Sequence, residues 1–264
     1  MSASAPRIAV VLSAGGLRGA AHVGVLRGLV RAGVQIDVLV GVSAGAVIAA
    51  YYAGTGLTLD ELTDDAVCFR GRHLLLHSIN VQLGHRFDRT LAPRCGIIPA
   101  RLRLLESATF DSLHHGVSAL GIGCHDVHTG VPRYFATGAS HGVALHEVVK
   151  ASASIPLLFP SVAVDCGDER WLLTDGGVSD PLPIAFARAA PLSATHVIVS
   201  DARWIGSTPP TDHRTAWIRP RMPGTGTLWT QRGLAAAVRC GDCAVTADVL
   251  ARICGWSIAR NGGR

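Results

Sequence analysis

Short apolar runs, separated by glycine-rich turns and amphipathic stretches, are the main pattern in the N-terminal part of the chain. Residues 7–13 and 35–41 are each rich in Val, Leu and Ile, as expected of buried strands. Between them, apolar residues recur at helical spacing over about residues 20–32, and Gly33 ends this pattern. Two strands joined by one helical crossover predict a right-handed βαβ unit and a parallel sheet.

Strand-like and helix-like segments alternate again after residue 116. The pattern predicts strands over residues 117–123, 133–136, 170–174 and 195–200, a hairpin around residues 128–130, and a helix over residues 145–153. After Asp201 the chain is rich in Pro, Gly, Thr and Arg until a helix-like stretch over residues 234–253, and residues 261–264 are expected to fray. The predicted fold class is α/β, a three-layer sandwich around a mostly parallel sheet.

Residues from about 54 to 116 interrupt this alternation. A helix is predicted over residues 57–69, beginning with a capping box in which Thr58 and Glu61 satisfy each other's backbone groups. Residues 70–103 contain seven arginines and a single acid, interleaved with leucines and isoleucines. Two interpretations stay open: a helical lid that meets a lipid surface, or a solvated face with a buried apolar stripe.

The length and composition of the chain fit one large core. Of 264 residues, 48% are hydrophobic and 16% are charged. We expect a single domain over residues 1–264. Its expected parts are a catalytic core over about residues 7–201, a helical, lid-like insertion over about residues 54–116 and a C-terminal helical segment over about residues 202–264.

Composition also bears on location and partners. No apolar run is as long as a bilayer span, the N-terminus lacks a signal-peptide pattern, and seven irregularly spaced cysteines fit reduced thiols. The protein is therefore expected to be cytoplasmic, with peripheral contact to a membrane as an open question. A net charge of +5 suits anionic membranes or nucleic acid, but an aromatic content of 5% offers few stacking platforms for bases. No nucleic-acid partner is expected, and the sequence does not predict an oligomeric state.

The second strand leads directly into Gly41-Val42-Ser43-Ala44-Gly45 and then into helix-forming residues. A serine at such a junction adopts a strained backbone, and Gly41 and Gly45 remove side chains that would collide where strand and helix meet. The Ser43 hydroxyl then lies at a helix N-terminus, where the dipole and free N–H groups favour developing negative charge. Ser43 is therefore the candidate nucleophile.

The glycine-rich loop after the first strand has four interpretations, of which the simplest is a tight turn that needs one glycine rather than three. A dinucleotide site is disfavoured because the acid Asp37 falls near the start of the second strand rather than at its end. A phosphate-binding P-loop is excluded because no Gly-Lys-Ser/Thr follows. An oxyanion hole uses the whole loop: the N–H groups of Gly15, Gly16 and Leu17 point at the oxyanion, and Arg18 steadies the loop or the charge.

A candidate functional acid follows a later strand. Residues 170–174 lead into Asp175 and two glycines, and an acid at a strand end is typical of a functional site rather than of a core. In a cleft that is partly shielded from water, burial would raise the pKa of this carboxyl and make it a better base.

Four ordered segments resemble the patatin-like phospholipase family, over most of the chain from Ile8 to about Asp201. They are GGLRGAAHVGVL (15–26), GVSAGA (41–46), ASASIPLLFP (151–160) and DGGVSDPLP (175–183). The resemblance implies a patatin-like fold and a Ser-Asp dyad, with Ser43 acylated and Asp175 as base. It also implies hydrolysis of acyl esters of phospholipids, lysophospholipids or neutral lipids, with no cofactor and no metal. Ala14 departs from the family pattern, which usually has the first of three glycines there.

Other functions stay open beside this one. A Ser-His-Asp esterase or thioesterase would use His196 or His213, but that fold needs several strands before its nucleophile and only one βα unit precedes Ser43. Acyl transfer to another alcohol and catalytically silent lipid binding are further alternatives; the intact Ser43 and Asp175 argue against the silent form. Ser154 is a rival nucleophile that no glycine turn frames.

Two groups have metal-like spacing. Cys240 and Cys243 lack a second pair and are interpreted as plain helix cysteines. His125, Asp126 and His128 lie near the predicted hairpin and are interpreted as turn residues.

Overall fold

The computed structural model describes residues 6–86, 88–140, 142–167, 169–206, 212–222, 224 and 228–261. Among these residues, eight strands form one sheet in the order β5-β6-β3-β2-β1-β7-β8, with β4 paired to β3. The strands are β1 (Ile8–Leu12), β2 (Val38–Val42), β3 (Ala119–Asp126), β4 (Pro132–Ala136), β5 (Val162–Cys166), β6 (Glu169–Asp175), β7 (His196–Ser200) and β8 (Thr215–Ile218). Strands β3, β2, β1, β7 and β8 run parallel, whereas β4, β5 and β6 add antiparallel pairs on the β3 side.

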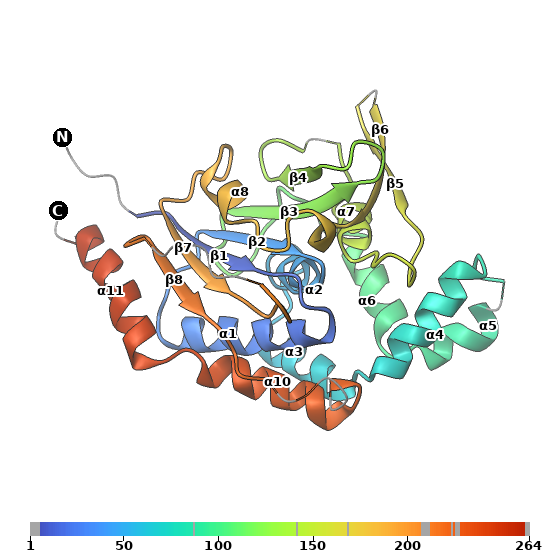
Figure 1. Cartoon of the computed structure of the whole chain (residues 1–264), viewed down its shortest axis with the longest axis horizontal. Coiled ribbons are helices and arrows are strands. Elements are labelled where there is room, and N and C mark those ends of the chain that lie inside the picture. Colours follow the sequence, from blue (N-terminus) through green and yellow to red (C-terminus); the bar gives the residue numbers. More distant parts are fainter. Residues whose placement is uncertain are drawn as a thin grey trace.

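Helices cover both faces of the sheet, so the predicted three-layer α/β fold is confirmed (Figure 1). Below the sheet in Figure 1 lie α1 (Ala20–Arg31), α3 (Leu59–Cys68) and α10 (Gln231–Cys243), and α8 (Ile184–Arg188) lies above it. The remaining helices are α2 (Ala44–Ala49), which continues as the π-helical turn η2 (Ala50–Gly54), α4 (Gly71–Gln82), α5 (Asp88–Leu91), α6 (Ile98–Leu105), α7 (Leu145–Ser152) and α11 (Ala247–Asn261). Short 3-10 helices are η1 (Gly16–Gly19), η3 (Ala92–Arg94) and η4 (Gly176–Val178).

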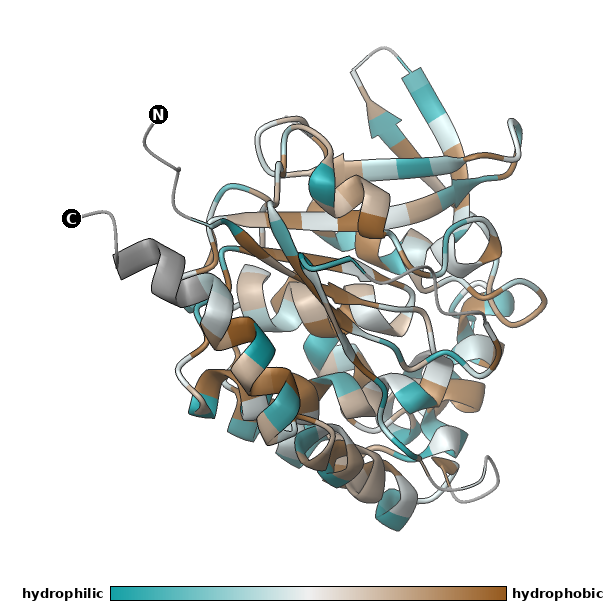
Figure 2. Ribbon diagram, turned by 60° about the vertical axis from the view of Figure 1, so that its left-hand side comes forward, coloured by the Kyte–Doolittle hydropathy of each residue, from teal (hydrophilic) through white to brown (hydrophobic). Residues whose placement is uncertain are grey.

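The central strands have two buried faces, which explains their unbroken apolar sequence. In β1, Val10 and Leu12 belong to the apolar cluster on one face, and Ala9 and Val11 to the cluster on the other. Figure 2 shows this as hydrophobic strands inside and outer helices of mixed character. A parallel sheet covered in this way brings the carboxyl ends of β1, β2 and β7 to one edge.

The capping box that begins α3 and the hairpin between β3 and β4 are as predicted. The second strand begins later than predicted, at Val38. The preceding Asp37 is turned inward, where its carboxylate accepts a 2.8 Å hydrogen bond from the N–H of Ile8. This contact gives Asp37 a structural role at the start of the sheet.

Two strands and one helix break lie outside the sequence predictions. The pattern did not predict β5, or β8 in the segment expected to be helical, because each is only four or five residues long and lies next to loops rich in Pro, Gly or Asp. The helix predicted over residues 234–253 is wrong as one element: it is divided into α10 and α11. The β-branched Val245 and Thr246 fall at the break, and the Thr246 hydroxyl accepts from the N–H of Val249.

The C-terminal part packs closely on the N-terminal helix. A side chain at Gly24 of α1 would collide with the carbonyl O of Val238, and one at Gly241 of α10 would collide with that of Ala21, so the two helices approach backbone to backbone. Asp242 forms ion pairs with two arginines of α1. Within the described ranges, no helix has both the length and the apolar character needed to cross a bilayer.

Candidate active site

Ser43 and Asp175 are in direct contact although 132 residues separate them. The Ser43 hydroxyl donates a 2.6 Å hydrogen bond to Oδ2 of Asp175. Ser43 follows the last residue of β2, and Asp175 is the last residue of β6, which pairs with β3. Both side chains are buried, with 4% and 5% exposed. The arrangement is a hydroxyl–carboxylate pair shielded from bulk water.

The backbone at Ser43 is strained and tightly enclosed. Ser43 has φ 56° and ψ −125°, a region that non-glycine residues rarely adopt. A side chain at Gly41 would collide with the carbonyl O of Gly45, and one at Gly45 with that of Leu12. These two glycines therefore permit the sharp strand-to-helix turn, as the sequence predicts.

A second serine holds this turn in place. The Ser152 hydroxyl accepts a 2.9 Å hydrogen bond from the N–H of Ser43 and donates one of 2.6 Å to the carbonyl O of Gly123. Ser152 is the last residue of α7 and is fully buried. Sequence reasoning did not single it out, although it lies within the segment 151–160 that carries the family resemblance.

The surroundings of Asp175 favour its protonated form. Burial raises the pKa of this carboxyl above its ordinary value, and hydrogen bonds from the Ser43 hydroxyl and the Gly177 N–H oppose that shift. The Gly177 N–H lies 2.8 Å from Oδ1, so each carboxylate oxygen has one donor. Such a carboxylate is a stronger base than a free aspartate.

The glycine-rich loop brings some of its predicted donors to the site. Gly16 and Leu17 line the same pocket as Ser43, and Gly16 has φ 52°. Within the described residues, their N–H groups have no protein acceptor, whereas the Arg18 N–H donates to the carbonyl O of Gly15. Gly15 itself lies against Ala202 and does not line the pocket.

The Arg18 side chain contacts the segment that follows β7 and does not line the pocket. Its Nε donates a 2.8 Å hydrogen bond to the carbonyl O of Ala202, and its guanidinium lies 5.0 Å from the ring centre of Trp204. Partial burial lowers the pKa of this side chain, and nearby Asp201 opposes the shift. Of the two roles expected for Arg18, these contacts fit the steadying of the loop.

The buried His22 contacts the residue that precedes the glycine-rich loop and the end of β7. His22 lies between Ser200, 2.7 Å from its Nδ1, and the carbonyl O of Ser13, 3.0 Å from its Nε2. Complete burial lowers the pKa of His22 to about 4, so the ring is neutral at pH 7. Nε2–H then donates to Ser13, Nδ1 accepts from Ser200, and the ends of β1 and β7 are joined.

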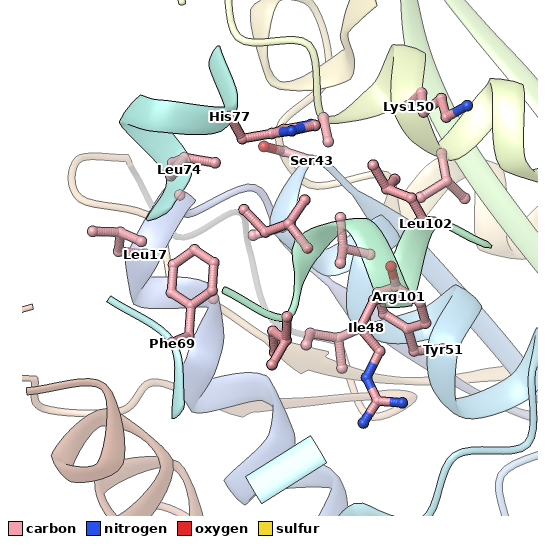
Figure 3. A pocket seen from close by; sticks show the side chains of 18 of the residues that line it. Leu17, Ser43, Ile48, Tyr51, Phe69, Leu74, His77, Arg101, Leu102 and Lys150 are labelled. Atoms are coloured by element: carbon pink, nitrogen blue, oxygen red, sulfur yellow. The ribbon is translucent and has the colours of Figure 1, made fainter. Parts of the chain in front are cut away.

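An apolar pocket of about 480 Å³ opens beside Ser43. Its walls come from the start of α1, from α2 and α3, and from the insertion helices α4 and α6, which lie on the right in Figure 1. The side chains labelled in Figure 3 are mostly aliphatic or aromatic, among them Leu17, Ile48, Phe69, Leu74 and Leu102. A cavity of this size and character suits an acyl chain.

Few polar side chains enter the pocket. The guanidinium of Arg101 points away from Ser43 in Figure 3 and forms two 2.7 Å hydrogen bonds with the carboxylate of Asp65. His77 of α4 and Lys150 of α7 also line the pocket. No sequence pattern indicated His77, because the insertion that carries it follows no recognised motif.

The rival catalytic residues lie elsewhere or have other partners. His196 begins β7 and His213 precedes β8, so both lie at the amino ends of parallel strands, opposite the edge that carries Ser43. The Ser154 hydroxyl donates to the carbonyl O of Lys150, and the Ser154 carbonyl accepts from the N–H of Asp175. Ser154 thus positions Asp175.

The groups with metal-like spacing have ordinary structural contacts. The Asp126 carboxylate accepts from the N–H of His128 and forms an ion pair with Arg133, which fits a hairpin turn. Cys240 and Cys243 are free thiols of α10. In the part of the chain that the structure describes, no three His, Cys, Asp or Glu side chains gather in a metal-binding arrangement.

Comparison with known proteins identifies the family of the chain. The family model for Patatin-like phospholipase matches residues 10–188, a segment that contains the glycine loop, Ser43 and Asp175. An uncharacterized NTE family protein of Mycobacterium tuberculosis is 31% identical over 185 residues, which cover 69% of this chain and 46% of that protein. Lysophospholipase nte1 of Emericella nidulans is 31% identical over 187 residues, which cover 67% of this chain and 11% of that protein.

The chain thus spans less than half the length of these two relatives. Among solved structures, VipD from Legionella pneumophila superposes with a TM-score of 0.54 at 12% identity, over 95% of this chain and 67% of VipD. At that identity, the likeness concerns the fold alone.

Proposed function

Because the chain belongs to the patatin-like phospholipase family, we propose that it is a serine lipid acyl hydrolase. Its substrates are acyl esters of phospholipids, lysophospholipids or neutral lipids. The observation that carries the proposal is the 2.6 Å hydrogen bond from Ser43 to Asp175 beside an apolar pocket. A relative named Lysophospholipase nte1 supports the inclusion of lysophospholipids.

In the first half of the proposed reaction, the acyl chain occupies the pocket and the ester carbonyl lies against Ser43. Ser43 Oγ attacks the carbonyl carbon while its proton passes to Oδ2 of Asp175. The N–H groups of Gly16 and Leu17 stabilise the oxyanion. The bond from carbonyl carbon to the alcohol oxygen then breaks, and Asp175 returns the proton to the departing alcohol.

In the second half, water attacks the acyl-enzyme. Asp175 takes a proton from that water, the acyl–Ser43 bond breaks, and the proton returns to Oγ of Ser43. A direct serine–aspartate pair needs no histidine between the two side chains. If an alcohol replaced the water, the same steps would transfer the acyl group.

We propose that residues 1–264 act as one domain, since β8 pairs with β7 and α10 packs on α1. Lipid esters are found in membranes and micelles, so the protein acts while peripherally bound to such a surface.

Turnover of a soluble nitrophenyl acyl ester tests the proposal. Ser43→Ala and Asp175→Asn should each lower kcat by at least about a thousandfold, because the two side chains act as one unit. Melting curves should show both variants folded. Near wild-type activity in either folded variant would reject the dyad, and the absence of ester or lipid turnover in the wild-type protein would favour the silent lipid-binding alternative.

A further inference from the structure

Helix α4 is a wall between the apolar pocket and solvent, and it is apolar on both sides. Leu74, His77 and Val81 line the pocket. The outer stripe consists of Leu75 and Ile79 of α4 and of Leu83, which caps the C-terminus of this helix. They are spaced four residues apart and are 41%, 48% and 41% exposed. When a helix has apolar residues on opposite sides, each side is expected to contact another apolar surface.

The loop between α7 and β5 places another apolar group beside this stripe. Leu157 is fully exposed and has φ 70°, a conformation that favours glycine. The loop is attached to α4, because the side-chain amide of Gln82 donates a 2.8 Å hydrogen bond to the carbonyl O of Leu158, and the Ser78 hydroxyl donates to the same oxygen. A leucine here costs backbone free energy and gains no packing, so its side chain is suited to an external partner.

The charges around the stripe favour one kind of partner. Residues 70–103 contain seven arginines and one acid. The exposed arginines of this segment are Arg70, Arg72, Arg86, Arg89, Arg94 and Arg103. Apolar side chains bordered by arginines fit the interface of an anionic lipid bilayer, where the alkyl groups enter the acyl region and the guanidinium groups meet phosphates.

We propose that Leu75, Ile79, Leu83 and Leu157 form a docking surface for an anionic lipid bilayer. The outer side of α4 then lies in the lipid interface while its inner side lines the acyl pocket. The biological role of this docking surface rests on the proposed function, but docking to the bilayer needs no catalysis. It makes α4 the element through which the active site approaches its substrate.

Vesicle co-sedimentation of the inactive Ser43→Ala protein tests the surface without turnover. With mixed phosphatidylcholine and phosphatidylserine vesicles, Ile79→Ser and Leu157→Ser should each weaken binding about tenfold, because each removes an inserted side chain. The matched control is Val131→Ser in the β3–β4 hairpin, where Val131 is 47% exposed, close to the 48% of Ile79. This control should bind as the parent does.

Charge is tested in the same assay. Arg72→Gln and Arg86→Gln should each weaken binding about fivefold at low ionic strength, and the difference should shrink at high salt. The control is Arg170→Gln, whose side chain is 73% exposed in the β5–β6 hairpin. Removal of phosphatidylserine from the vesicles should reduce binding of the parent and abolish the effect of both arginine variants.

The proposal is overturned if Ile79→Ser and Leu157→Ser bind vesicles as tightly as the parent does. It is also overturned if Val131→Ser loses as much vesicle affinity as these two variants. It is also overturned if these variants lose only self-association, measured by sedimentation velocity, because the stripe would then contact a second copy. With Ser43 intact, turnover of a soluble ester should stay at the wild-type level in all of these variants. Failure of the wild-type protein to hydrolyse any ester would reject the proposed function and leave the vesicle result standing.

Discussion

The hydroxyl of Ser152 lies between the N–H of Ser43 and the carbonyl O of Gly123, at 2.9 and 2.6 Å. It joins α7, the turn after β2 and strand β3 at the point where Ser43 adopts its strained backbone. Ser152 thus acts on the reaction through the position of Ser43.

Ser152→Ala should leave two buried backbone groups without a partner and lower the stability by about 1–3 kcal/mol. We expect kcat to fall by roughly ten- to a hundredfold with little change in KM, because Ser43 is displaced. Labelling by a fluorophosphonate should slow in parallel. The matched control is Ser154→Ala, whose hydroxyl donates to the carbonyl O of Lys150 rather than to the turn at Ser43. Equal kcat values for the two variants would contradict the positioning role.

The pKa of Asp175 predicts a pH profile. Since burial raises this pKa above its ordinary value of about 3.9, kcat/KM should fall as the pH drops through the raised value. The protonated carboxyl cannot accept the Ser43 proton. Activity that stays constant down to about pH 3.9 would contradict a base with a raised pKa.

The same shift has a consequence for stability. The folded protein binds this proton more tightly than the unfolded chain does. Protonated Asp175 therefore stabilises the fold, and this stabilisation is fully present below the pKa of the unfolded chain. It is lost as the pH rises through the pKa of the folded protein. Above the pKa of the folded protein, the ionised carboxylate of Asp175 is therefore destabilising. Asp175→Asn should melt at the wild-type temperature or above it, and a lower Tm would contradict this expectation.

Gly16→Ala tests the oxyanion role of the loop. Gly16 has φ 52° and open space around its Cα, so an added methyl group strains the backbone without a collision. Displacement of its N–H should lower kcat by roughly tenfold to a thousandfold, with a smaller effect on KM. Gly33→Ala is the control, because Gly33 has φ 74° and equally open space but ends α1 outside the site. Both variants should lose similar stability, and a loss confined to KM in Gly16→Ala would mean that the loop only shapes the pocket.

His77 tests whether the dyad acts without a histidine. It lines the pocket with Ser43, yet the Ser43 hydroxyl donates directly to Asp175. His77→Gln should therefore keep kcat for a soluble ester near the wild-type value, although KM can change. A catalytic histidine would instead lower kcat by several orders of magnitude, and such a loss in a folded variant would replace the dyad with a triad.

The sequence by itself determined the parallel core and the chemistry attached to it. Buried strands read as unbroken apolar runs, and the sharp turn at Ser43 requires Gly41 and Gly45 because any side chain there would collide with backbone. The α3 capping box was also predictable, since its two partners are only three residues apart. These features depend on local sequence, and local sequence was enough to find them.

The tertiary structure alone decided how distant groups meet. Ser152 supports Ser43 from 109 residues away, Arg101 binds Asp65 across the pocket, and α4 turns one apolar side inward and another outward. The short strand β8 is stable because β7 supplies its hydrogen bonds, whereas its four residues carry no distinctive pattern. Such contacts form only when distant segments of the chain pack together. The free energy of burial that stabilises them comes from several segments at once, so no local sequence pattern predicts them.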